Sequence, residues 1–286
     1  MLWCRVLYHG RGPQRKSLHA KIENAETRQV GCAFRKPSAA GPSADETGSL
    51  SYDCKGRSVD YEGKKSIGML KTTTNDGLHE FVGAKVLSRF ARAGIRAADL
   101  GTGPGAMAER LQSLGCDVIG ADMSADSFGA KLPHVVVNFD QPDFASQFGT
   151  EKFNLVTAIE VIEHVESPIG FLRNIGNLLA PGGVAVITTP NVESLPARLK
   201  FLLRGKIRTI DEHGEPTHIS PIFTDLLDRQ YLKRTSLQLQ EHYVFPANGF
   251  QLSRKMFSII LGILAGLMPG ESIKGDNHVW VFGARE

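Results

Sequence analysis

The chain has 286 residues, of which 42% are hydrophobic, and a formal net charge of +3. This length suits one hydrophobic core with additions, or at most two small domains. The charge is uneven: residues 1–50 hold eight basic and four acidic side chains, and the remainder is close to neutral. A nucleic-acid-binding protein would need an excess of basic residues in its folded part, which residues 51–286 lack, so we expect no nucleic-acid partner.

The four cysteines lie far apart and form no Cys-x-x-Cys pair. This spacing argues against structural zinc and against a disulfide framework, and it suits a reducing compartment. Residues 1–65 are predicted to be a disordered basic extension and linker, without the pattern of a secretory signal. We expect a cytoplasmic protein. Import into an organelle by the basic N-terminus stays open, although Glu23 and Glu26 count against it.

Ordered structure is expected from about residue 70, where polar residues precede a helical pattern that ends near Gly94. Beyond this helix, apolar segments typical of strands alternate along the chain with segments that have a helical pattern. Strands are predicted at residues 95–100, 117–124, 134–140, 152–159 and 184–191, and helices at 104–115 and from Pro168 onward, with Ser167 as the N-cap. Strands that alternate with helices indicate an α/β fold with a parallel sheet.

The rhythm changes after Asn191. A basic amphipathic helix is predicted at residues 194–206, and an apolar run of 14 residues follows at 256–269. The remaining segments are a loop at 207–221, a helical segment at 224–235 and strands at 236–245 and 277–284. We therefore expect a single domain over residues 70–286, with insertions around 194–222 and 250–272.

A glycine turn follows the first predicted strand of this domain. The segment Asp99-Leu-Gly-Thr-Gly-Pro-Gly105 lies between a strand and a helix, and Asp122 ends the next strand 23 residues after Asp99. Glycines allow a ligand to approach the backbone closely, and an acid in this place can hold the hydroxyls of a ribose. NAD and S-adenosylmethionine both fit this much. The acid before the glycines, the acidic end of the fourth strand and the Leu-Leu-Ala-Pro-Gly-Gly segment favour S-adenosylmethionine.

Five segments stand in an order and spacing that carry a family resemblance. They read ADLGTGPGA, VIGADMS, FNLVTAIEVIEHV, LLAPGG and ITTPN. Together they resemble the class I S-adenosylmethionine-dependent methyltransferases, nearest to the ubiquinone-biosynthesis O-methyltransferase-like group. The resemblance implies a Rossmann-like, seven-stranded and mostly parallel sheet with helices on both faces. The last strand, at residues 277–284, would run antiparallel.

The resemblance also implies a set of cofactor-binding residues. They are Asp99, Gly101, Thr102, Gly103, Gly105, Asp122, Met123, Asp140 and Glu160. Asp99 would pair with the amino-acid ammonium group of the cofactor or order the turn, and Asp122 would bind the ribose. For Asp140 two interpretations stay open: a contact with the adenine amino group, or a solvated turn residue.

The segment Glu160-Val-Ile-Glu-His-Val raises the question of catalysis. Glu160, Glu163 and His164 lie at the carboxyl end of a strand, where an open α/β sheet binds ligands. One interpretation is structural. The other makes the three residues a general base or the ligands of a divalent metal, as the resemblance to the ubiquinone-type enzymes implies. We favour no metal, and name these three residues as its ligands if one binds.

Three further histidines are candidates for the site, two on the acceptor side and one on the cofactor side. His213 and His218 lie in the loop after the fifth strand, and His218 joins the proposed catalytic residues. His79 either closes over the cofactor or lies on a helix surface. A lone loop histidine is more often solvated than catalytic, so the histidines carry less weight than the Glu160–His164 segment.

The predicted function is S-adenosylmethionine-dependent O-methylation of a small or lipid-linked acceptor. Alternatives are a sugar, glycan or other metabolite as acceptor, a non-catalytic S-adenosylmethionine-binding module, and an NAD-dependent dehydrogenase. The segment at 194–206 predicts either a lid helix over the acceptor pocket or contact with an anionic membrane. The run at 256–269 is too short to span a bilayer and predicts a core helix, an interfacial segment or a lipid pocket. Together they would make a peripheral membrane patch or a hydrophobic acceptor site.

Overall fold

The computed structural model describes residues 51–52, 58–59, 70, 74–150 and 152–285. The chain divides into two units between Gly48 and Ser49, and the description below concerns the second. Two short strands, β1 (Ser51–Tyr52) and β2 (Ser58–Val59), pair antiparallel. The rest of the extension predicted over residues 1–65 lies outside the described residues.

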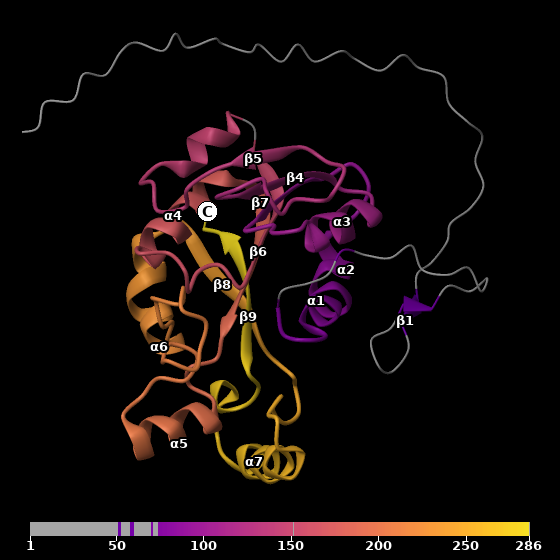
Figure 1. Ribbon diagram of the computed structural model, residues 1–286. Helices are drawn as coiled ribbons and strands as arrows, with labels where there is room; N and C mark the ends of the chain where they lie inside the picture. Colours follow the sequence, from indigo (N-terminus) through magenta and orange to yellow (C-terminus); the bar gives the residue numbers. More distant parts are fainter. Residues whose placement is uncertain (1–50, 53–57, 60–69, 71–73, 151, 286) are drawn as a thin grey trace, which may run out of the picture. The chain divides into compact units, whose positions relative to one another are not determined.

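A seven-stranded sheet forms the centre of the second unit, in the order β5-β4-β3-β6-β7-β9-β8 (Figure 1). Its strands are β3 (Arg96–Leu100), β4 (Asp117–Asp122), β5 (His134–Val136), β6 (Phe153–Ile159), β7 (Leu179–Pro190), β8 (Leu237–Phe245) and β9 (Asn277–Ala284). The first five are parallel, and β9 runs antiparallel to both of its neighbours. The predicted fold class is confirmed, including the direction of the last strand.

Helices cover both faces of the sheet. They are α1 (Leu78–Val82), the π-helix η1 (Gly83–Leu87), α2 (Ser88–Phe90), α3 (Ala106–Ser113), the 3-10 helix η2 (Phe144–Phe148), α4 (Pro168–Leu178), α5 (Leu195–Arg204), α6 (Thr224–Leu226), the π-helix η3 (Leu227–Tyr231), the 3-10 helix η4 (Leu232–Arg234), α7 (Lys255–Leu267) and the 3-10 helix η5 (Glu271–Ile273). The Ser167 hydroxyl accepts a hydrogen bond from the Gly170 N–H, which confirms the predicted N-cap of α4.

Two apolar clusters lie on opposite faces of the sheet. Successive residues of a strand point to opposite faces, so Ala97 on β3 joins the cluster under α1 and α3, while Ala98 joins the cluster under α4. On β6, Leu155 and Val156 divide in the same way. The strands therefore read as continuous apolar runs, as expected for a parallel sheet covered on both sides.

The structure differs from the predicted elements in four places. The helical segment predicted at 224–235 is divided into α6, the π-helix η3 and the 3-10 helix η4. The third strand ends at Val136, since residues 137–140 turn toward η2. The single helix expected between residues 78 and 90 is interrupted by the π-helix η1. The Ala-Pro-Gly-Gly segment, residues 180–183, was expected only to stop α4, but it lies within β7, whose pairing with β6 is irregular there.

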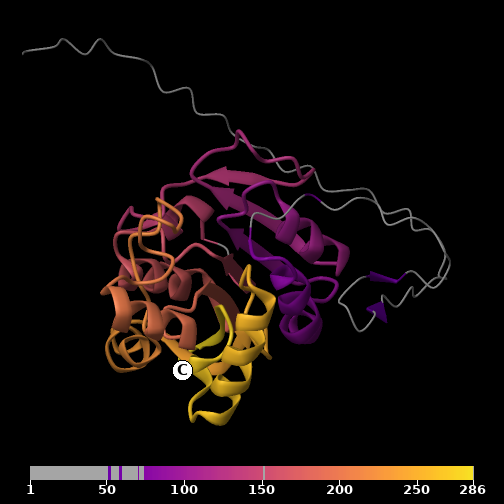
Figure 2. The same ribbon diagram turned by 60° about the horizontal axis from the view of Figure 1, so that its bottom comes forward.

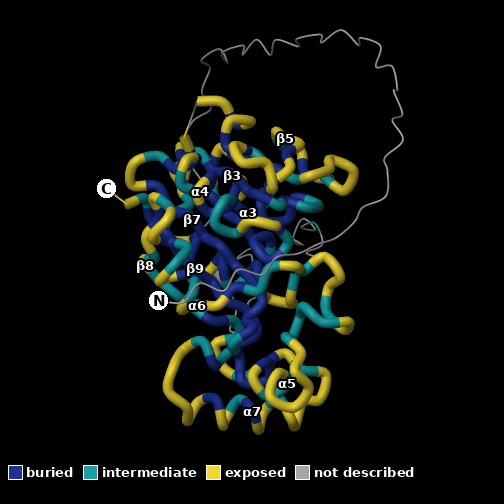
Figure 3. The backbone as a smooth tube through the Cα atoms, turned by 90° about the vertical axis from the view of Figure 1, so that its left-hand side faces the viewer, coloured by how far each residue is buried: buried dark blue, intermediate teal, exposed yellow. Residues whose placement is uncertain are grey.

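The two predicted insertions pack against one another at one end of the unit. Helices α5 and α7 lie side by side there (Figures 1 and 3), around a small apolar cluster that includes Leu195, Leu261 and Ala265. Within the described part of the chain, no helix has the length and hydropathy needed to cross a membrane.

Candidate functional site

The glycine turn joins β3 to α3 at the carboxyl edge of the sheet. Gly101, Gly103 and Gly105 have φ angles of +68°, +50° and +102°, in the left-handed region that favours glycine. A Cβ on Gly101 would meet Cγ2 of Val161 at 2.3 Å, whereas a Cβ on Gly103 would meet nothing within 4 Å. Gly101 is thus needed for packing against the Glu160–His164 segment, and Gly103 faces open space where a ligand can approach.

Asp99 orders this turn from beneath. Its buried carboxylate accepts hydrogen bonds from the hydroxyls of Thr102 and Thr157, each at 2.7 Å. Burial raises the pKa of Asp99 to about 6, against the opposing effect of these two bonds. These hydrogen bonds are the contacts that the predicted turn-ordering role of Asp99 requires. The Thr102 hydroxyl donates one of them. A pairing of Asp99 with the cofactor ammonium stays a prediction.

Asp122 links the end of β4 to the same turn. Its Oδ2 accepts the Gly103 N–H at 2.9 Å and its Oδ1 accepts the Met123 N–H at 2.7 Å. The Met123 side chain is 61% exposed beside it. Each oxygen of this half-buried carboxylate can accept a further hydrogen bond, so Asp122 can still accept hydrogen bonds from the hydroxyl groups of a ribose. The ribose role stays a prediction.

Asp140 lies on an exposed turn after β5. Its Oδ1 accepts the N–H of Glu166 at 2.7 Å, which ties the turn to the segment before α4. Asp140 is therefore an exposed turn residue that also makes a structural contact. Its predicted contact with adenine stays a prediction.

Glu160 directly follows β6 and has an unusual backbone conformation. Its φ is +58°, and its N–H donates to the Thr188 hydroxyl at 3.0 Å. Its Oε1 accepts a hydrogen bond from Asn277 Nδ2 at 2.8 Å. Burial raises the pKa of Glu160 to about 7, and the bond from Asn277 opposes the shift. A left-handed glutamate beside a ligand edge is a form of strain that occurs at functional sites.

Asn277 is a site residue that the sequence did not reveal. It is fully buried at the start of β9 and holds Glu160 with its amide nitrogen. Its Oδ1 accepts a hydrogen bond from Asn75 Nδ2 at 2.6 Å, so the chain before α1 connects to the end of β6. A single asparagine in an apolar strand carries no sequence signal for this contact, which spans 117 positions.

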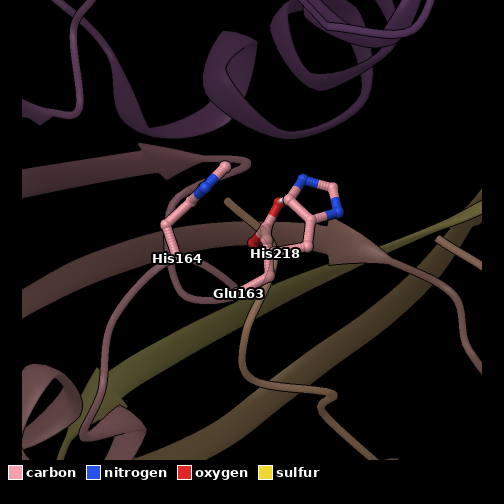
Figure 4. A group of neighbouring side chains, drawn as sticks. All are labelled: Glu163, His164 and His218. Atoms are coloured by element: carbon pink, nitrogen blue, oxygen red, sulfur yellow. Dashed lines mark ion pairs between the residues drawn. The ribbon is translucent and has the colours of Figure 1, made fainter. Parts of the chain in front are cut away.

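A carboxylate and two imidazoles meet in the loops that follow β6 and β7. One ligand atom from each of Glu163, His164 and His218 lies within 4.8 Å of the others, and Figure 4 shows the three side chains pointing to the same side. The predicted triplet was Glu160, Glu163 and His164. The structure places His218 in this group, while Glu160 turns toward Asn277.

The loop at residues 207–221 brings His218 into position. The N–H groups of Ile219 and Ser220 both donate to the Glu163 carbonyl at 2.9 Å, and the Ser220 hydroxyl donates to the Val165 carbonyl. His218 Nδ1 lies 3.1 Å from the Thr209 carbonyl. Since a carbonyl only accepts hydrogen bonds, this contact assigns the proton of a neutral ring to Nδ1 and leaves the lone pair on Nε2.

The group has the electrostatics of a proton-transfer site. Glu163 is 2% exposed, and burial, followed by the charge of Glu160, raises its pKa well above the ordinary value. Burial also lowers the pKa of His164 and of His218, so both imidazoles are neutral near pH 7. His218 Nε2 lies 3.9 Å from Glu163 Oε1. A neutral imidazole lone pair that faces a buried carboxyl group can accept a proton.

The same three residues fit a divalent cation by chemical type. Carboxylate oxygen and imidazole nitrogen are common metal ligands, and neither Glu163 oxygen has a hydrogen bond of ordinary geometry within the described residues. Glu163, His164 and His218 would hold such an ion. Asp211, Glu212 and His213 also lie close together, but Lys200 and Lys206 pair with the two acids.

Two candidate histidines lie apart from this group. The His213 side chain is 69% exposed and lies 3.6 Å from Glu212. His79 was expected to close over the cofactor or to lie on a helix surface. It is buried in α1, so the helix-surface interpretation is wrong, and closure over the cofactor stays a prediction. Burial, with a smaller effect of Arg110, lowers its pKa to about 4.

Comparison with known proteins agrees with this architecture. The family model described as "Methyltransferase domain" matches residues 77–242. The chain is 33% identical over 105 residues to a ubiquinone biosynthesis O-methyltransferase of Ruegeria pomeroyi, covering 35% of this chain and 42% of the relative. It is 35% identical over 128 residues to the Glaesserella parasuis enzyme of the same name, covering 41% and 50%. The chain thus spans about half the length of these relatives.

A solved structure shares the fold. A putative methyltransferase from Bacillus halodurans superposes with a TM-score of 0.50 at 17% identity, covering 71% of this chain and 99% of that one. The family match covers more than half of the chain and includes the glycine turn, the Glu160–His164 segment and His218. The chain therefore belongs to the methyltransferase-domain family, among the class I S-adenosylmethionine-dependent methyltransferases.

Proposed function

We propose that the protein transfers the methyl group of S-adenosylmethionine to a hydroxyl oxygen of a small or lipid-linked acceptor. The observation that carries this proposal is the meeting of two neutral imidazoles with the buried Glu163 carboxyl group. Through the contact of Val161 with Gly101, this group lies next to the turn that we assign to the cofactor. A hydroxyl acceptor is the class that needs a base in this position.

The reaction divides the work between the two parts of the site. The cofactor methyl is already activated by the positive sulfur, so the turn has to hold it in line with the acceptor oxygen. As the new oxygen–carbon bond forms, the carbon–sulfur bond breaks and S-adenosylhomocysteine leaves. The acceptor proton passes to Nε2 of His218, and an oxygen of the buried Glu163 carboxyl group, 3.9 Å away, lies where it can accept a hydrogen bond from the resulting imidazolium.

A divalent cation is the alternative way to ionise the acceptor. When bound, it would lower the pKa of a coordinated hydroxyl group. Glu163, His164 and His218 would then act as ligands, and the Nδ1 contact of His218 with the Thr209 carbonyl would orient its ring. We favour the metal-free route, because burial raises the pKa of Glu163 and so disfavours the ionised carboxylate that a metal ion needs as a ligand.

The names of the relatives support oxygen as the acceptor atom and a lipid-like quinone precursor as one acceptor class. A sugar, a glycan or another metabolite is the alternative acceptor within the same reaction. A non-catalytic domain that only binds S-adenosylmethionine would share the turn, but it would gain nothing from the gathered bases. The family match leaves no support for an NAD-dependent dehydrogenase.

The test is transfer of radiolabelled methyl groups to three soluble acceptor sets and one lipid extract. Phenols, aliphatic alcohols and amines are compared after treatment with a chelator, with and without added magnesium. We expect label on phenols or on an extracted lipid hydroxyl, without a requirement for metal. Label on amines only would contradict O-methylation, and turnover restored only by magnesium would favour the metal route.

A further inference from the structure

Helices α5 and α7 carry an apolar surface that nothing within the described residues covers. Both lie at the end of the unit that Figure 2 turns toward the viewer, and both are largely exposed in Figure 3. The exposed large apolar side chains of this end are Phe201, Leu202, Leu203, Met256, Phe257, Ile259, Ile260, Ile263, Leu264, Leu267 and Met268. They account for most of the exposed large apolar side chains of the described chain.

Helix α7 is held to the protein by a narrow stripe. Only Leu261 and Ala265, one turn apart, are buried, while apolar residues cover most of the remaining circumference. Leu202 on α5 and Leu267 on α7 are 78% and 80% exposed. A contiguous apolar surface of this kind is unusual on a protein that stays in water, and it marks an interaction site.

A groove of about 510 Å³ separates the two helices. Apolar side chains such as Leu203 and Phe257 line it together with four cations: Lys200, Arg204, Arg208 and Arg254. Lys200 pairs with Asp211, and Arg208 pairs with Asp276. Arg204 and Arg254 have no acidic partner among the described residues, so two guanidinium groups at the groove are available for an anion.

The basic side chains around the groove favour an anionic partner. Residues 194–208 hold five basic and no acidic side chains, and Lys255 begins α7. Three of the five basic side chains are paired with acids from other segments: Lys200 with Asp211, Lys206 with Glu212 and Arg208 with Asp276. A second copy of this chain would bring the same unpaired arginines to this surface and would offer them no complementary charge. An anionic bilayer offers the complement, because its acyl region accepts the apolar side chains while its phosphates meet the cations. With 13 residues, α7 is about 20 Å long, so it fits in the plane of the interface and not across a core of about 30 Å.

We propose that α5 and α7 dock on an anionic phospholipid membrane, with one lipid phosphate seated in the groove between Arg204 and Arg254. Docking would bring the carboxyl edge of the sheet near the bilayer. Arg208 at the groove binds Asp276, and the next residue, Asn277, binds Glu160. A lipid-linked acceptor would therefore reach the site from the membrane. The docking itself does not depend on the proposed O-methylation.

The experiment measures flotation of the full-length protein with vesicles of phosphatidylcholine alone or mixed with phosphatidylglycerol. We expect binding to the mixed vesicles and little to the neutral ones, with weakening as salt rises. The double variant Arg204→Glu/Arg254→Glu should lose at least tenfold in partition coefficient. Lys131→Glu/Lys233→Glu makes the same charge change at exposed lysines elsewhere and should bind as the wild type does.

A second pair of variants tests the apolar part. Leu202→Ser/Leu267→Ser should weaken flotation at least fivefold, whereas Val136→Ser, an exposed apolar site on β5, should leave it unchanged. Affinity for S-adenosylhomocysteine, measured by calorimetry, shows that each variant is folded. Equal binding of both charge-reversal variants would overturn the phosphate seat. Absence of vesicle binding by the wild type, with or without self-association in light scattering, would overturn membrane docking.

Discussion

The glycine turn and the Glu163 group lie side by side at the carboxyl edge of the sheet, but they differ in how far their acidic side chains are hydrogen-bonded. In the turn, every acid has its partners: Asp99 holds two hydroxyls and Asp122 holds two backbone N–H groups. In the neighbouring group, Glu163 is buried with only weak contacts from its own N–H and the Thr189 hydroxyl, and two imidazoles stay neutral beside it. A buried acid left unsatisfied costs folding free energy, so it persists where chemistry uses it.

Removing the Glu163 carboxyl group should produce the largest effect. In Glu163→Ala we expect turnover to fall by about 10²–10⁴-fold, since the imidazolium loses the carboxyl oxygen that can accept its hydrogen bond. Affinity for S-adenosylhomocysteine should stay within about twofold, because the turn is untouched. Calorimetry and steady-state rates measure the two quantities. The matched control is Glu166→Ala, which removes an exposed carboxylate three positions away and should leave the rate unchanged. A Glu163→Ala enzyme with normal turnover would contradict the comparison.

Two alanine substitutions in the turn should separate packing from ligand approach. Gly101→Ala forces a Cβ into Val161 at a left-handed φ, and should lower the free energy of unfolding by about 2–4 kcal/mol. Gly103→Ala meets open space, so it should cost only about 1 kcal/mol for its φ while weakening S-adenosylhomocysteine binding about tenfold or more. Denaturant melts and calorimetry check both. Normal cofactor binding by Gly103→Ala would show that the open space is not the cofactor site.

Much of this comparison could be predicted from the sequence. The order of strands and helices, the glycine turn with Asp122, and the placement of Glu163 and His164 after β6 follow from apolar runs and local spacing. Other features depend on contacts across long sequence distances. His218 joins Glu163 only because Ile219 and Ser220 bond its carbonyl, and Asn277 reaches Glu160 from the last strand. No local pattern encodes such contacts, and the π-helical break after α1 likewise has no sequence signal.

The loop that carries His218 offers a subtler way to disturb the acceptor side. A Cβ on Gly214 would lie 2.1 Å from the Thr209 carbonyl oxygen, the acceptor for His218 Nδ1. Gly214→Ala should therefore displace this carbonyl and reduce turnover about tenfold, with cofactor affinity unchanged. Gly266→Ala is the control, because its Cβ meets nothing within 4 Å on α7. If both variants retain full turnover, the position of His218 is not set by this contact.

The smallest expected effect concerns pH. The folded pKa of Glu160 is raised to about 7 from an ordinary value of 4.5, so the folded state binds more protons than the unfolded one between these values. Its contribution to stability is therefore full below pH 4.5 and is lost as pH rises through 7. Relative to the wild type, Glu160→Gln should gain roughly 1–3 kcal/mol between pH 4.5 and 7 in denaturant melts. A pH-independent difference would show that the buried acid titrates normally.

The central claim is that neutral His218 takes the acceptor proton, and the pH profile of kcat/KM in His218→Asn tests it most directly. For the wild type we predict an acid limb below the ordinary histidine pKa of 6.5, because burial lowers the pKa of His218. In His218→Asn, kcat/KM should fall by about 10²-fold or more, the acid limb should disappear, and S-adenosylhomocysteine should bind normally. A variant that keeps the wild-type rate and the same acid limb would contradict the account.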